Sequence, residues 1–160
     1  MDGVLTDFDK QFSEIHPWST TKFTEKNGKD EFWELIDGRG VGFWVGMDWM
    51  EDGKELFKFI TENFHVELLS SPSRAEHSRL GKRLWVRNHK LGVKLNLAYS
   101  YHKQKYAAPS HILIDDRKEG GKEWVLYTTC VLFFKTYYTT CLLLIIIIIV
   151  NQHHVIGHLI

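Results

Sequence analysis

A short apolar segment, Ile112–Ile114, is followed directly by two aspartates, Asp115 and Asp116. An apolar run of this length is too short for a helix and predicts a buried strand. Lys105 precedes the same strand. A lysine before the strand and two carboxylates after it suit phosphate and metal chemistry, because the ammonium attracts a phosphate and the carboxylates attract a cation.

Helical and strand-like patterns alternate through the middle of the chain. The predicted elements are helices over Glu51–Asn63 and Ser73–His89, and strands over Val66–Leu69 and Val93–Tyr99. Ser73 and Glu76 form a capping box at the start of the second helix, which is predicted to place Leu80, Leu84 and Trp85 on one face. Strands that alternate with helices predict an α/β fold with a parallel sheet.

The N-terminal part has a weaker pattern. Phe8, Phe12 and Ile15 recur at helical spacing before Pro17. Residues 16–29 are predicted to be a loop or an irregular cap, and residues 30–37 a short helix. The opening residues 1–9 form an acidic turn of the kind that follows a buried strand, although no strand precedes it, which suggests that a first strand is missing.

Charge is unevenly distributed along a chain whose net charge is zero. Residues 1–67 contain 15 acids and 7 bases, whereas residues 74–105 contain 9 bases and a single acid. An acidic part facing a basic one suits a site for a cation and a phosphate, and a solvated basic helix is the alternative. The two cysteines, Cys130 and Cys141, indicate neither a disulfide framework nor a zinc cluster, so a reducing cytoplasm is expected.

Residues 125–160 differ from the rest of the chain. They are apolar, of low complexity, and repeat the sequence Tyr-Thr-Thr-Cys before five consecutive isoleucines. Three alternatives are open: a membrane segment, a buried or aggregation-prone strand, and sequence unrelated to the fold of the domain. Self-association of the full chain is predicted.

The motifs at the predicted strand ends resemble those of the haloacid dehalogenase superfamily, and most closely its 5'(3')-deoxyribonucleotidase branch. The resemblance covers residues 1–124, and its motifs are residues 2–8, Ser70-Ser71-Pro72, Lys105 and residues 114–117. It implies a Rossmann-like three-layer parallel sheet with a small helical cap insert over about residues 16–50. It also implies a phosphomonoesterase that acts on nucleoside 5'(3')-monophosphates through an aspartyl-phosphate.

The resemblance also implies roles for individual residues. Asp2 matches the aspartate that protonates the leaving oxygen and activates water, while the position matching the nucleophile lies before Met1, so impaired turnover is expected. Ser70 and Lys105 match the groups that hold the phosphoryl group. Mg²⁺ is the implied cofactor; at least one of Asp115 and Asp116 binds it, Asp116 being favoured as the direct ligand, and Asp2 supplies its backbone carbonyl.

Substrate contacts are implied for a further set of residues: Ser71, Phe8, Phe43, Trp44 and Val45. The pair Phe32-Trp33 is an alternative to Phe43-Trp44 for holding the base, and either pair is equally well explained as core. Two other functions stay open. One is a non-catalytic phosphate or nucleotide binder, and the other is a nucleic-acid-binding module using the basic helix, which the zero net charge disfavours.

Overall fold

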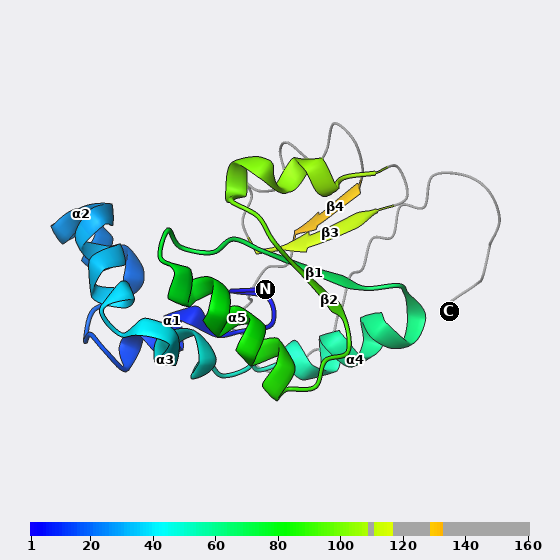
Figure 1. Cartoon of the computed structure of the whole chain (residues 1–160), viewed down its shortest axis with the longest axis horizontal. Helices are drawn as coiled ribbons and strands as arrows, with labels where there is room; N and C mark the ends of the chain where they lie inside the picture. The colour runs from blue at the N-terminus through cyan, green and yellow to red at the C-terminus, as the bar shows by residue number, and fades with distance from the viewer. Residues whose placement is uncertain (109–110, 117–128, 133–160) are drawn as a thin grey trace, which may run out of the picture. The chain divides into compact units, whose positions relative to one another are not determined.

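The computed structural model describes residues 1–108, 111–116 and 129–132. The chain divides into two units, Met1–Tyr106 and Ala107–Ile160 (Figure 1). Within the described ranges, no helix is both long enough and apolar enough to cross a bilayer.

The first unit contains a parallel pair of strands. β1 (Glu67–Ser70) and β2 (Lys94–Leu97) are joined through α5 (Glu76–Asn88), and Ser70 pairs with Leu97 in the register. A helix between two parallel strands is the β-α-β unit that alternating patterns predict, so this part of the prediction is confirmed. The short 3₁₀ helix η1 (Ser100–Tyr106) follows β2 and ends the unit.

The second unit contains another parallel pair, β3 (Ile112–Asp115) and β4 (Thr129–Leu132). β3 confirms the strand predicted before the aspartate pair. β4 lies inside the segment 125–160, where a strand was one of the three alternatives. The predicted membrane segment and the isoleucine run lie outside the described residues.

The N-terminal helices correct one prediction. α1 (Phe8–Ser13) is the expected helix, but α2 runs over Thr20–Asp37, so most of the predicted loop 16–29 is helical. Ser19 begins α2, its hydroxyl accepting a hydrogen bond from the Lys22 amide. Gly28, with φ of 88°, kinks the helix, which explains why the sequence around it suggested a loop.

An aromatic core joins these helices to α3 (Gly40–Val45) and the loop that follows it. Buried rings and methionines from residues 12–50 form most of this core: Phe12, Phe23, Phe32, Phe43, Trp44, Met47 and Met50. α4 (Gly53–Asn63) then leads into β1 and confirms the predicted helix. These helices fall within or next to the predicted cap insert; the three-layer sheet itself stays a prediction.

α5 differs from its prediction in which face it buries. Its buried residues are Ser78, Gly81, Lys82 and Trp85, whereas Leu80 is 47% exposed. The reason is a close approach to α3: a Cβ on Gly81 would overlap the Cβ of Trp44. The capping box is also wrong, because Ala75 is the N-cap and the Ser73 hydroxyl donates to Asp37 at 3.0 Å.

Candidate functional site

A buried lysine on α5 joins the opening turn to the end of β1. The ammonium of Lys82 forms an ion pair with the carboxylate of Asp2 and donates a hydrogen bond to the Ser70 hydroxyl at 2.9 Å. The Lys82 side chain is fully buried, and Ser70 is 1% exposed. Because Ser70 is the last residue of β1, the cluster lies at the carboxyl end of the parallel pair, where α/β folds bind ligands.

Packing between α3 and α5 holds Lys82 in place. Its ammonium lies 4.8 Å from the centroid of the Trp44 ring, a cation–π geometry. One turn further along α5, the indole of Trp85 donates to the Met47 carbonyl at 2.7 Å. Gly81, beside Lys82, allows the close approach of the two helices. The close packing of α3 on α5 therefore fixes the position of the Lys82 ammonium.

Asp2 carries the negative charge of the cluster. Burial raises the pKa of its carboxyl, but the charges of the Lys82 ammonium and the N-terminal amine, together with hydrogen bonds from Lys82 and Thr6, outweigh burial and leave the pKa below its ordinary value. Thr6 donates at 3.3 Å, and the Asp2 side chain keeps 28% of its surface exposed. The resting state is thus a carboxylate at neutral pH, able to accept a proton and accessible from one side.

Ser71 presents a second hydroxyl directly after β1. Its Oγ is buried and has no hydrogen-bond partner among the described residues. A buried hydroxyl without a partner costs about 1–3 kcal/mol, so a ligand that accepts its proton would bind with that advantage. Of the two predicted substrate residues at the end of β1, Ser70 contacts Lys82, and Ser71 contributes a buried hydroxyl beside it in the sequence.

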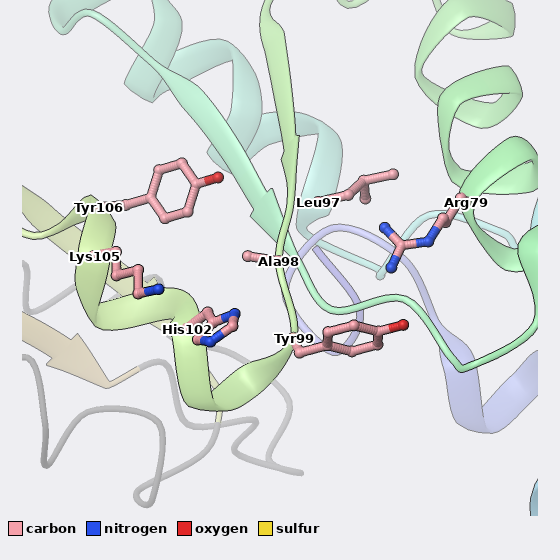
Figure 2. A pocket seen from close by; sticks show the side chains of 7 residues that line it. All are labelled: Arg79, Leu97, Ala98, Tyr99, His102, Lys105 and Tyr106. Atoms are coloured by element: carbon pink, nitrogen blue, oxygen red, sulfur yellow. The ribbon is translucent and has the colours of Figure 1, made fainter.

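The structure separates Lys105 from these contacts. Lys105 is exposed on η1 and lines a different pocket together with Arg79 and Tyr99 (Figure 2), while Lys103 on the same helix is only 6% exposed. The lysine that contacts Ser70 and Asp2 is Lys82, which the sequence analysis did not select. The role of Lys105 toward a phosphoryl group stays a prediction.

The aromatic residues predicted to contact substrate lie in the core. Phe43 and Trp44 are almost fully buried, and Phe8 and Val45 are half-buried. The ring of Phe8 lies 5.3 Å from that of Phe43, in an edge-on arrangement. Direct stacking of a base on Phe43 or Trp44 would require neighbouring side chains to move, so their binding role stays a prediction. Of the alternative pair, only Trp33 offers an exposed ring.

Two of the three predicted metal ligands, Asp115 and Asp116, lie at the end of β3 in the second unit, and the third, the Asp2 carbonyl, belongs to the first unit. Asp115 is buried and Asp116 is exposed. Their carboxylates are the oxygen ligands that Mg²⁺ prefers, so the donor set fits the ion in kind. Among the described residues, no group of three or more His, Cys, Asp or Glu side chains comes together as a metal site.

The sequence contained a signal for Lys82. Ser78, Gly81, Lys82 and Trp85 recur at the i, i+3, i+4, i+7 spacing of one helix face. Because this face of α5 also carries two small residues and a tryptophan, the pattern predicts that Lys82 points toward the core. Of the face predicted from Leu80, Leu84 and Trp85, Trp85 is buried as expected, whereas Leu84 is half-buried and Leu80 is exposed.

No protein-family model matches the chain, and no curated protein is significantly similar to it.

Proposed function

We propose that this chain carries the phosphate-binding part of a cytoplasmic, magnesium-dependent phosphomonoesterase for nucleoside monophosphates. The observation that supports it most is the buried Lys82 ammonium, hydrogen-bonded to both Asp2 and Ser70 at the carboxyl end of β1. A buried ammonium next to the Ser70 hydroxyl offers the charge and a donor of the kind that a phosphoryl dianion requires.

The proton chemistry of Asp2 follows from its dependence on Lys82. In the resting state Lys82 lowers the pKa of Asp2, against the effect of burial. A bound phosphate would compete for the same ammonium, and the pKa of Asp2 would then rise. Asp2 could therefore take up a proton when substrate binds and deliver it to the leaving oxygen, as the sequence resemblance implies.

Asp115 and Asp116, which the resemblance implies as metal ligands, would hold magnesium in this proposal, since their carboxylates are oxygen ligands of the kind that this ion takes. The residues of the first unit bind and orient the phosphoryl group: Ser70 and Ser71 donate hydrogen bonds, and Lys82 supplies a positive charge.

Binding tests this proposal without requiring the nucleophile, which has no match in residues 1–160. Thymidine 5'-monophosphate is titrated calorimetrically in the presence of Mg²⁺ against the chain and its Ser71→Ala variant. Removing a buried hydroxyl without a partner should leave the free energy of unfolding unchanged or higher, yet weaken nucleotide binding about three- to tenfold, the value of one hydrogen bond.

The matched control is Ser13→Ala, which removes an exposed hydroxyl whose hydrogen bond goes to the Lys10 carbonyl on α1. It should leave nucleotide affinity unchanged. If Ser71→Ala binds the nucleotide as tightly as the unmodified chain, the phosphate site at the end of β1 is wrong.

A further inference from the structure

A row of arginines lies along α5. Arg79, Arg83 and Arg87 recur every four residues, so they share one side of the helix. Arg83 and Arg87 are exposed, and neither forms an ion pair with a described residue. Arg79 is 23% exposed, and Glu76 approaches it at 3.5 Å. Two of the three guanidinium groups therefore keep a positive charge that no neighbouring carboxylate compensates.

Two stacked tyrosines lie beside the first arginine of this row. The guanidinium of Arg79 lies 5.1 Å from the centroid of the Tyr99 ring. Tyr101 stacks on Tyr99, with 5.7 Å between the ring centroids and 6° between the planes. Tyr101 nevertheless remains 61% exposed. Because Tyr99 covers only one face of Tyr101, the other face offers a stacking surface to a further planar ring.

The pocket at the end of β2 connects the arginines to the tyrosines. It has a volume of about 350 Å³, and Arg79, Tyr99 and Tyr106 are among the residues that line it (Figure 2). His102 lines it as well, and its ring lies 4.5 Å from that of Tyr101. None of the described residues in the lining is acidic. A pocket with a guanidinium and several rings suits a planar ring that is attached to an anionic chain.

We propose that this surface binds single-stranded nucleic acid. The arginines of α5 contact the phosphodiester backbone, while bases stack on the exposed ring of Tyr101 and enter the pocket beside Arg79. Proteins that bind single strands without reading their sequence combine these two features, a positive track for the backbone and aromatic rings for the bases.

The zero net charge of the whole chain does not describe this surface. Residues 74–105, which supply its arginines and its stacked tyrosines, contain 9 bases and a single acid. The acidic side chains of a polypeptide would satisfy the arginines but leave the open face of Tyr101 uncovered, so the aromatic pair favours a nucleic acid. Only a single strand can splay out its bases for such stacking.

This inference goes beyond the proposed phosphomonoesterase. A strand bound here is a chain of phosphodiesters, and its contacts include neither Ser70 and Ser71 nor Lys82.

The test is a fluorescence-anisotropy titration of the full chain into a labelled oligouridylate of about 12 nucleotides, without Mg²⁺. We expect saturable binding that weakens with salt. For single strands the slope of log affinity against log salt is about −0.7 per neutralised phosphate, so three arginines give about −2. A duplex of the same length should bind at least about fivefold more weakly, the value of one stacked base.

Two substitutions separate the contacts to bases from those to the backbone. Tyr101→Ala should weaken binding about five- to hundredfold and leave the salt slope unchanged, because it removes stacking alone. Arg83→Gln should reduce the magnitude of the salt slope by about 0.7, because it removes one charge. Both side chains are exposed, so both variants are expected to fold.

The matched controls are Phe64→Ala and Lys58→Gln, which remove an exposed ring at the end of α4 and an exposed lysine on it. Each should change the affinity less than about twofold. Ser71→Ala should bind the oligonucleotide as the unmodified chain does, so failure of the phosphate site at β1 is distinguishable from failure here. If Tyr101→Ala binds no more weakly than Phe64→Ala, or if polyglutamate displaces the strand as well as unlabelled oligouridylate does, the proposal is wrong and the surface attracts anions in general.

Discussion

Replacing two glycines on facing helices by alanine tests the packing that holds Lys82. Gly81 lies on α5 and Gly42 on α3, and both are helical. A Cβ at Gly42 would meet no atom within 4 Å. A Cβ at Gly81 would overlap the Trp44 Cβ and lie 3.2 Å from both the Trp44 Cγ and the Val41 carbonyl oxygen. The same chemical change should therefore have opposite effects.

The magnitudes follow from two competing contributions. Alanine in a helix is favoured over glycine by up to about 1 kcal/mol, so Gly42→Ala should raise the free energy of unfolding by that amount or less. At Gly81 the same gain is opposed by overpacking, which costs about 1–3 kcal/mol. The neighbouring atoms belong to the stem of a buried side chain and to backbone, which cannot rotate away. We expect Gly81→Ala to be destabilised relative to Gly42→Ala by about 1–3 kcal/mol.

Urea unfolding followed by tryptophan fluorescence measures both variants against the unmodified chain. The slope of unfolding should stay the same, so that the shift in midpoint reports stability. If Gly81→Ala is as stable as Gly42→Ala, then α3 and α5 do not approach as closely as described, and the account of how Lys82 is positioned fails with it.

Three further predictions use the same unfolding assay. Asp2→Asn should lower the free energy of unfolding at pH 7, by up to about 3–5 kcal/mol, because it removes the carboxylate that is paired with the buried Lys82 ammonium; a loss no larger than that of an exposed ion pair would contradict the importance of this contact. Because folding lowers the pKa of Asp2, this carboxylate stabilises the fold fully at pH values above its unfolded pKa, near 3.9, and the stabilisation is lost as the pH falls through its folded pKa. Asp2→Asn should therefore reduce the loss of stability that acid causes in the unmodified chain. An unchanged acid limb of the stability-versus-pH curve would count against the lowered pKa. Trp85→Phe should lower the free energy of unfolding by about 1–3 kcal/mol, because the Met47 carbonyl loses its hydrogen-bond donor. Trp33→Phe, at an exposed ring, should change it by no more than about 0.5 kcal/mol. Equal effects of the two substitutions would refute the hydrogen bond from Trp85 to Met47.

The parts of the fold that sequence reasoning predicted well are those with an uninterrupted local pattern. The three apolar residues before the acidic pair predict β3, and apolar residues at helical spacing predict α4. Each of these elements is therefore specified by its own residues. The helix over residues 20–27 was missed because Gly28 interrupts it. That glycine bends the chain without ending the helical segment, and only the packing of Phe23 against Phe12 and Phe32 makes this visible.

The candidate site was predicted in part. Asp2, Ser70 and Ser71 were selected because acidic and hydroxyl residues follow predicted strand ends, and the structure brings Asp2 and Ser70 onto one ammonium. Lys82 was missed because its partner is 80 residues away, and no local pattern reports such a contact. The burial of a charged side chain is decided by tertiary packing, here by the small residues around it on α5.

The kink at Gly28 divides α2 into two parts that different neighbours hold. The second half of α2 is tied to α5 because Asp37 accepts from Ser73 at 3.0 Å and lies 3.3 Å from His77. α3 is held to α5 by the contact at Gly81. Residues 20–27 are held elsewhere, because Phe23 packs on Phe12 of α1 and the Thr20 hydroxyl donates to Asp9 at 2.8 Å. One helix thus carries two attachments on either side of Gly28, the first to α1 and the second to the region of α5.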